Sequence, residues 1–179
     1  MCLLNKEIDT YQKNIVNQLF KNFNQTTTKK ANISAHFTLK YSFYANSKQL
    51  KELKEIVSNF SKKQKKQKIK IGGFDNFEQK VIFLKINPSP KVKNLITELH
   101  KELKKLNWLT FKDIETNGIN LHATISQDST EKQYPIILKF LKNKEQYFNT
   151  YLDNISIMKL STRKNFRKKF IIEKKYKLQ

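Results

Sequence analysis

The tetrapeptide HFTL at residues 36–39 returns as HATI at residues 122–125, and this repetition is the strongest indication of the fold. Each copy lies in a run of aromatic, aliphatic or β-branched residues, which is typical of a β-strand. In a strand, residues two apart point to the same side of the sheet. Each copy is therefore predicted to present an imidazole and a hydroxyl on one face and two apolar side chains on the other.

Hydrophobic spacing predicts the elements around the two motif strands. Apolar residues at three- and four-residue steps indicate four helices, and alternating or β-branched runs indicate strands. The polar run at residues 25–32 and the stretch up to residue 120, which includes Gly118, are expected to lack helices. The predicted helices span residues 8–24, 47–60, 92–106 and 131–151, and the predicted strands span 2–5, 33–44, 69–74, 80–87, 121–126, 154–160 and 166–178.

This order of elements is itself duplicated along the chain. Helix, strand, helix, strand, strand occurs once in the first half and again in the second half, with one tetrapeptide in each. A chain of 179 residues can build one buried core or two small lobes that share a core, but is short for two independent domains. We therefore expect one compact domain spanning residues 1–179.

The net charge of +21, from 36 basic and 15 acidic residues, favours a polyanionic partner such as RNA. Only Arg163 and Arg167 are arginines, and asparagine is also abundant, so an AT-rich genome offers a second explanation for the many lysines. Charge alone does not decide between them. The lysine-rich tracts near residues 61–70 and 163–177 are read either as a surface for a nucleic-acid backbone or as a solubilising surface.

The start of the chain and its single cysteine indicate a cellular compartment. Cys2 cannot form a disulfide within the chain, which favours a reducing environment. The apolar stretch at the start is too short for a secretory signal, and no window approaches the roughly 18 apolar residues of a membrane span. A monomeric, cytoplasmic protein without a membrane partner is expected.

Two histidines and two threonines are the candidate catalytic groups. His36 and His122 can serve as acid and base, while the hydroxyls of Thr38 and Thr124 can bond phosphate oxygens. Lys40 follows the first motif on the same predicted strand face and is a further candidate for phosphate binding. The structural alternative is that each histidine is bonded within its own strand, which is less convincing for a duplicated pair than for either histidine alone.

Metal and nucleotide cofactors are not expected from the sequence. No third ligand completes a zinc site, since Cys2 is terminal and His100 lies in a predicted helix where we interpret it as a surface residue. The pair Gly72-Gly73 lacks the lysine and hydroxyl residue of a phosphate-binding loop. The sequence therefore favours catalysis by the two histidines without a metal or nucleotide cofactor.

These features resemble the two-histidine (2H) phosphoesterase superfamily, and within it the 2'-5' RNA ligase-like and 2',3'-cyclic phosphodiesterase branch. The resemblance covers nearly the whole chain: HFTLKYSF is close to the family's first motif, a glycine-containing strand lies between the motifs, and LDNISIMKL matches a closing strand. It implies an α+β fold of two pseudo-symmetric lobes, roughly residues 1–80 and 81–179, with some strands exchanged. Each lobe would be a small antiparallel sheet with outer helices, and the motifs would line the cleft between the lobes.

The resemblance also implies residue roles and an activity. The first-motif histidine, His36, would donate a proton to the leaving oxygen, and His122 would activate water. The expected activity is hydrolysis of a 2',3'-cyclic phosphate to a 2'-phosphate or of a 2'-5' linkage. The same arrangement run backwards would join a 2',3'-cyclic end to a 5'-hydroxyl, which is RNA ligation. Many relatives carry a basic residue shortly after the second motif, whereas this chain has Ser126, Gln127 and Asp128. The alternative is a non-catalytic basic RNA-binding module that keeps the fold.

Overall fold

The computed structural model describes residues 1–116, 120–162 and 168–179. Gly118, Arg163 and Arg167 lie outside the described residues. The elements are β1 (Cys2–Leu3), α1 (Lys6–Phe23), α2 (Thr27–Ala31), β2 (His36–Phe37), α3 (Ser47–Ser61), β3 (Gln67–Phe77), β4 (Val81–Asn87), α4 (Pro90–Leu103), α5 (Asp113–Thr116), β5 (His122–Ser126), α6 (Tyr134–Lys142), β6 (Tyr147–Leu152), β7 (Asn154–Thr162) and β8 (Lys168–Lys177).

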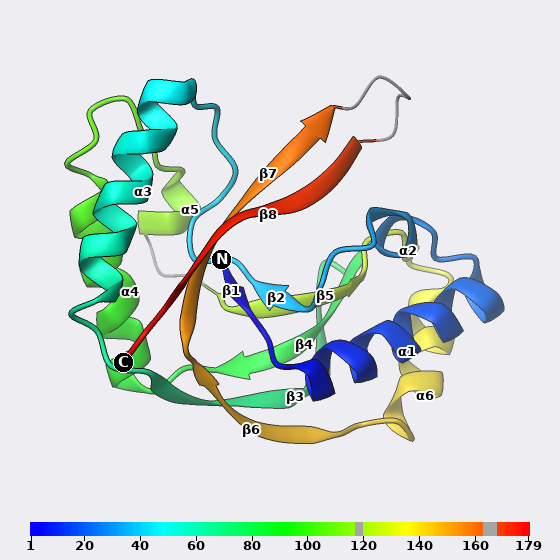
Figure 1. The fold of residues 1–179 in the computed structure, drawn as a ribbon. Helices are drawn as coiled ribbons and strands as arrows, with labels where there is room; N and C mark the ends of the chain where they lie inside the picture. Colours follow the sequence, from blue (N-terminus) through cyan, green and yellow to red (C-terminus); the bar gives the residue numbers. More distant parts are fainter. Residues whose placement is uncertain (117–119, 163–167) are drawn as a thin grey trace.

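Two antiparallel sheets form the centre of the molecule (Figure 1). One has four strands in the order β5-β4-β3-β6. In the other, the pairs β1-β2 and β7-β8 are joined by backbone hydrogen bonds of 2.7 and 3.0 Å between Met1 and Ser156. This second sheet therefore has the order β8-β7-β1-β2. The predicted α+β class with antiparallel sheets and outer helices is confirmed.

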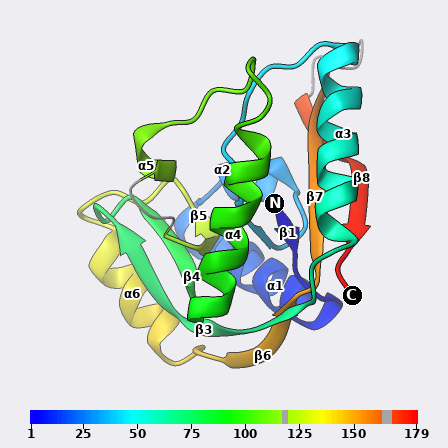
Figure 2. The ribbon, with the colours of Figure 1, turned by 90° about the vertical axis from the view of Figure 1, so that its left-hand side faces the viewer.

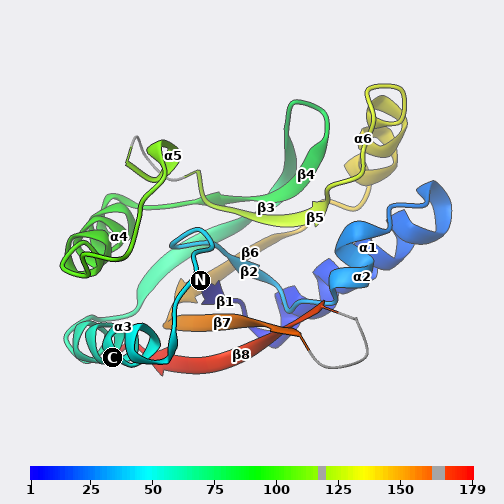
Figure 3. The same cartoon turned by 90° about the horizontal axis from the view of Figure 1, so that it is seen from above.

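Both motif strands lie at an edge of their sheet, and the two edges meet. β2 ends one sheet, β5 ends the other, and the two strands are in contact. Figures 1 and 3 show them side by side near the middle of the molecule. The predicted two-lobe arrangement is confirmed, and the duplicated motifs lie where the lobes meet.

The chain builds the two sheets in different ways. The four-stranded sheet consists of consecutive strands, β3 to β6, within residues 67–152, whereas the other sheet combines the first 37 residues with residues 154–177. The chain thus crosses from one sheet to the other twice, between β2 and β3 and between β6 and β7, and does not divide at residue 80. The sheet that contains β2 therefore joins the two ends of the described chain.

The helices gather at two ends of the molecule (Figures 1 and 3). The helix α1 begins after Asn5, whose side chain accepts the Ile8 N–H at 3.0 Å, and it packs its apolar face against β5. At the other end, α3 and α4 lie side by side, as Figure 2 shows, and α3 also contacts β7 and β8. No helix among the described residues is long and apolar enough to cross a membrane.

The predicted helix at residues 131–151 is wrong over its second half. The helix α6 ends at Lys142, and residues 147–152 form β6, paired with β3. In the segment YFNTYL, the second, fourth and sixth residues are buried and the others are exposed, which is the alternation of a strand. The helical spacing that reached Phe148 had continued across a real boundary at residues 143–146.

The predicted strand at residues 33–44 is also wrong in length. β2 contains only His36 and Phe37, because its partner β1 offers only Leu3 and Cys2 for pairing. Beyond Phe37 the chain leaves the sheet, so alternation no longer fixes the direction of later side chains. Two short helices, α2 and α5, occupy stretches that were expected to lack helices.

The four-stranded sheet has one buried face and one open face. Buried and exposed residues alternate along β6 and along the paired ends of β3 and β4 at residues 68–71 and 84–87. The pattern is interrupted at the bulge of β3 between Ile71 and Phe74, and at Ile82, Phe83 and Leu84 of β4, which are all buried. The buried face carries aliphatic and aromatic side chains that belong to the core. The exposed residues on the other side of these strands, which form the open face, are Lys68, Lys70, Asp75, Lys85, Asn87, Tyr147, Asn149 and Tyr151.

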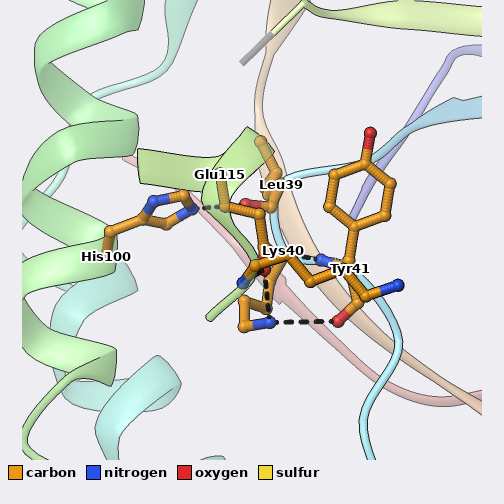
Figure 4. Close-up of polar contacts among 6 residues, drawn as sticks. Leu39, Lys40, Tyr41, His100 and Glu115 are labelled. Carbon is orange, nitrogen blue, oxygen red and sulfur yellow. Dashed lines mark hydrogen bonds and ion pairs between the residues drawn. The ribbon is translucent and has the colours of Figure 1, made fainter. Parts of the chain in front are cut away.

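A buried ion pair anchors the segment that follows the first motif (Figure 4). Lys40 Nζ lies 2.9 Å from Glu115 Oε2, and the two side chains are 8% and 0% exposed. Glu115 also accepts the backbone N–H groups of Tyr41 and Lys112 at 2.8 and 2.9 Å. Burial alone would raise the pKa of Glu115, but the two backbone hydrogen bonds and Lys40 outweigh burial and hold that pKa below its usual value.

His100 belongs to the same anchor, so its interpretation as a surface residue is wrong. It is 8% exposed, and its Nε2 donates to the carbonyl oxygen of Leu39 at 2.6 Å (Figure 4). Its ring also meets the edge of Phe111 at 5.2 Å between centroids. His100 therefore holds α4 to the segment behind the first motif.

Replacing Glu115 should destabilise the protein more than replacing Lys40. Glu115→Ala leaves two N–H groups without their acceptor and the buried Lys40 ammonium without a counter-charge, with only the Tyr41 carbonyl at 3.4 Å as an acceptor, at a cost of about 3–5 kcal/mol. Lys40→Met leaves a carboxylate that still accepts two N–H bonds, and should cost about 1–2 kcal/mol. Urea unfolding measures both, with exposed Glu55→Ala as the control. Equal losses for the two variants would contradict this asymmetry.

Candidate active site

The first motif histidine is fixed by a backbone hydrogen bond. Nδ1 of His36 lies 2.8 Å from the carbonyl oxygen of Ser34, which can only accept a hydrogen bond, so Nδ1 carries the hydrogen. The strand around it is held by the Ala35 N–H, which donates to Asp9 at 2.7 Å, and by pairing with Leu3 on β1. The other ring nitrogen, Nε2, is left for chemistry.

The second motif histidine is held in the same way. Nδ1 of His122 donates to the carbonyl oxygen of Asn120 at 2.7 Å, again two residues earlier in the chain. Its ring is flanked by two aromatic rings, with centroids 4.9 Å away for Phe77 and 5.1 Å away for Phe83. Both histidines thus share one tautomer, and each keeps Nε2 available.

The surroundings of His36 favour its neutral form. Burial is the main cause that lowers the pKa of His36 below its ordinary value of 6.5. The hydrogen bond to Ser34 acts in the opposite direction, while the amino terminus and His122 lower the pKa of His36 further. His36 is therefore held toward its neutral form in the free protein.

The two threonines differ in how they are positioned. Thr124 lies two residues beyond His122 on β5, and its backbone carbonyl accepts a hydrogen bond from Gln12 on α1. Thr38 follows the last residue of β2 and is no longer part of the strand. Both side chains are half-buried, and neither hydroxyl has a hydrogen bond within the described part of the chain. The two hydroxyls are thus free to bind a ligand.

The third phosphate-binding candidate, Lys40, has another partner in the structure. Its ammonium group pairs with buried Glu115 and lies 4.7 Å from the centroid of the Phe111 ring. The expectation that Lys40 shares a strand face with His36 fails, because β2 ends at Phe37. The charge of Lys40 is therefore already matched by a carboxylate inside the protein.

Two of the three residues after the second motif bind the segment that leads from α1 into α2. The hydroxyl of Ser126 donates to Gln25, and the carboxylate of Asp128 accepts the N–H of Thr27 at 2.6 Å as well as its hydroxyl. Asp128 thereby binds the first turn of α2, whereas Gln127 is exposed. The place where relatives carry a basic residue is used here to attach α2 to β5.

A lysine that sequence reasoning missed lies beside His122. Lys85 on β4 is the direct cross-strand partner of His122, so both side chains leave the same face of the sheet. Lys85 is exposed, and a Cβ atom added to Gly73 would stand 3.2 Å from its Cε. The alternation in KVIFLKIN placed Lys85 on the polar side of a strand, but only strand pairing reveals which residue it faces.

Solved structures share this fold. A Thermus thermophilus protein, TT0787, matches with a TM-score of 0.70 and 10% sequence identity, over 99% of this chain and 94% of that one. Escherichia coli LigT matches with a TM-score of 0.62 and 11% identity, over 95% of this chain and 92% of LigT. At these identities the likeness concerns the fold alone.

Sequence relatives point to the same group. A Geobacillus thermodenitrificans protein, provisionally named as a phosphoesterase, is 27% identical over 128 residues, 70% of each chain. A similarly named Geobacillus kaustophilus protein is 25% identical over the same length. The family model described as 2'-5' RNA ligase superfamily matches residues 10–164, which include both motifs. The chain therefore belongs to the 2'-5' RNA ligase superfamily of two-histidine phosphoesterases.

Proposed function

We propose that the chain is a metal-independent RNA phosphoesterase that opens a 2',3'-cyclic phosphate to a 2'-phosphate or cleaves a 2'-5' linkage. The observation that carries the proposal is the matched pair of motif histidines. Each donates Nδ1–H to the carbonyl two residues earlier, and each stands on an edge strand facing the other lobe. Two imidazoles can supply the acid and the base of this reaction, so the mechanism requires no metal.

In the proposed hydrolysis, a water molecule attacks phosphorus in line with O3' of the terminal ribose. Nε2 of His122 takes a proton from the water, and Nε2 of His36 gives a proton to O3' as the bond from phosphorus to O3' breaks. The product carries a 2'-phosphate and a free 3'-hydroxyl. The hydroxyls of Thr38 and Thr124 donate hydrogen bonds to the non-bridging oxygens as their charge grows.

The same groups serve a second nucleophile. A 5'-hydroxyl that takes the place of water would join two RNA ends through a 2'-5' linkage, and the reverse of that step would cleave such a linkage. Which of these reactions dominates depends on the groups that bind the second nucleotide. Ligation uses the same base and acid as hydrolysis. In the reverse step they exchange roles: Nε2 of His36 takes the proton from the attacking O3'–H, and Nε2 of His122 gives a proton to the leaving O5'.

The relatives support this substrate class. The matched family is named for 2'-5' RNA ligation, and two Geobacillus relatives are provisionally named as phosphoesterases. E. coli LigT has been crystallised with 3'-AMP, a nucleotide whose phosphate stands on the ribose 3' oxygen. A phosphate on the 2' and 3' oxygens of a terminal ribose is the corresponding substrate proposed here.

Lys85 is proposed to supply the positive charge that relatives place after the second motif. It lies opposite His122 on the neighbouring strand, and it has no ion pair among the residues that the structure describes. An ammonium group at this position can bond a phosphate oxygen beside the water that His122 activates. Asp128 and Ser126 are engaged elsewhere, so neither competes for this role.

Replacing either motif histidine should abolish turnover. With a short RNA that ends in a 2',3'-cyclic phosphate, in excess EDTA, His36→Ala and His122→Ala should each lower kcat by about 10²–10⁴-fold, because each removes an acid or a base. His100→Gln, a change to the third histidine, should retain activity per folded molecule. If wild type turns over neither this RNA nor a 2'-5' linked one, and RNA binding ignores His36→Ala, the chain is a binding module.

The pH dependence should reveal which histidine is the acid. If His36 donates the proton, it must be charged, so kcat/KM falls as pH rises through the lowered pKa of His36 in the free protein. The alkaline limb of the kcat/KM profile therefore lies below pH 6.5. A bound phosphate anion favours the charged imidazole, so the alkaline limb of kcat should lie at higher pH. The residual activity of His36→Gln should lack this limb. If the pH profile of His36→Gln lost its acidic limb and kept its alkaline limb, His36 would be the base and not the acid.

Lys85→Met should weaken catalysis without unfolding the protein. Methionine keeps the apolar stem but removes a charged bond to phosphate, so kcat/KM should fall by about 10–100-fold. Lys139→Met, at an exposed position of α6, serves as the control and should leave kcat/KM unchanged. An unchanged kcat/KM for Lys85→Met would show that a group other than Lys85 balances the negative charge of the phosphate.

A further inference from the structure

The open face of the four-stranded sheet extends the active site away from His122. Lys85 on β4 is the neighbour of His122, and the Gly72-Gly73 bulge of β3 lies next in the same direction. Tyr147 on β6 follows, and it lies over the bulge: a Cβ atom on Gly73 would stand 3.1 Å from its hydroxyl oxygen. With strands about 4.8 Å apart, this row crosses about 14 Å of sheet from His122 to Tyr147.

Two further rows of polar side chains run parallel to the first. Asn87 on β4 pairs with Lys70 on β3, which pairs in turn with Asn149 on β6. In the last row, Lys68 pairs with Tyr151. Direct cross-strand partners point to the same side, so all these groups share one surface.

The charge of this surface is strongly asymmetric. The ammonium groups of Lys68, Lys70 and Lys85 have no ion-pair partner within the described residues. The acidic groups nearby are Asp75, which shares the face beyond the bulge, and Glu145, which accepts the Tyr147 hydroxyl at 3.0 Å. Neither carboxylate lies in the rows that hold Lys68 and Lys70.

The other sheet offers no comparable surface next to the active site. Its strand β1, formed by Cys2 and Leu3, is buried, and residues 154–156 of β7 are buried at successive positions. The exposed lysines of that sheet, Lys159, Lys174, Lys175 and Lys177, lie on β7 and β8, which the buried strand β1 separates from β2. An RNA that leaves the active site over the strand next to a motif strand therefore meets an open, basic surface on the β5-β4-β3-β6 side.

We infer that the open face binds the single-stranded RNA that precedes the reacting ribose; this inference rests on the proposed function. A 2',3'-cyclic phosphate ends an RNA, so the rest of the molecule extends from the 5' side of the terminal ribose. Lys68 and Lys70 would pair with its backbone phosphates, and Asn87 and Asn149 would bond sugars or base edges. The face thus selects oligonucleotides over a cyclic mononucleotide.

Two tyrosines favour single strands over duplexes. Tyr147 is 72% exposed and Tyr151 is 40% exposed, so both rings are accessible to a ligand on the open face. The Lys66 ammonium lies 5.3 Å from the centroid of the Tyr151 ring, and Glu145 holds the hydroxyl of Tyr147, so both rings are oriented. Unpaired bases can stack on such rings, whereas the bases of a helix are covered by their neighbours.

The test compares two substrates and two charge-matched variants. The substrates are a 2',3'-cyclic mononucleotide and an RNA of about eight nucleotides with the same end. Lys68→Glu/Lys70→Glu changes the open face, and Lys48→Glu/Lys51→Glu makes the same change in net charge on exposed positions of α3. Tyr147→Leu tests stacking at an exposed position, and Lys68→Gln/Lys70→Gln is the milder variant if the charge reversal impairs folding.

The open-face variants should lose activity on the oligonucleotide only. Lys68→Glu/Lys70→Glu should lower kcat/KM for the RNA by about tenfold or more, and should hydrolyse the mononucleotide like the wild type, because that substrate does not reach Lys68 or Lys70. Lys48→Glu/Lys51→Glu should retain most of its activity on both substrates. Equal losses for the two double variants would overturn the inference, since they would reflect total charge.

A binding measurement separates this inference from the proposed catalysis. Fluorescence anisotropy with the same RNA ending in a 3'-phosphate should show weaker binding by Lys68→Glu/Lys70→Glu, with the salt slope reduced by about one for each lost phosphate contact. If the wild type turned over neither the RNA with a 2',3'-cyclic end nor a 2'-5' linked RNA, the proposed function would be refuted and this binding result would still stand. Binding of a duplex as tight as that of the single strand, or binding unaffected by the open-face variants, would refute the inference.

Discussion

The hydrogen bond from each motif histidine to the carbonyl two residues before it is the constraint on which the site depends. It fixes one tautomer for both rings, so that Nε2 of His36 and Nε2 of His122 are available to act as acid and base. A bond of this kind needs a local backbone that is itself held in place. Pairing of β2 with β1, and of β5 with β4, provides that support.

The shortness of β2 makes the segment behind it unusually dependent on side chains. A strand of two residues cannot direct residues 38–46, and the buried pair of Lys40 with Glu115 does so instead, together with the bond from His100 to Leu39. The second motif needs no such anchor, because β5 is longer and Gln12 binds its backbone from α1. The duplicated tetrapeptide is thus supported by two different sets of contacts.

The sequence was sufficient for the fold class and for the pairing of the motifs, because both depend on local patterns. Alternation of apolar residues indicated most strands, and the repeated tetrapeptide indicated two related halves that meet. Sequence spacing failed where long-range pairing decides: it extended a helix into β6 and extended β2 to residue 44. It also assigned Lys40 to the phosphate and overlooked Lys85, because the partners of both lysines are set by tertiary contacts.

The two halves repeat one motif but have diverged in what surrounds it, and this divergence assigns different tasks to the lobes. His36 is half-buried, and the sheet behind it is buried at β1 and at residues 154–156. His122 stands at the edge of a sheet whose second face is open, basic and aromatic. A closed lobe can position a catalytic group but cannot accommodate a polymer, whereas an open sheet can. We therefore expect the lobe that contains His122 to distinguish long RNA substrates from short ones.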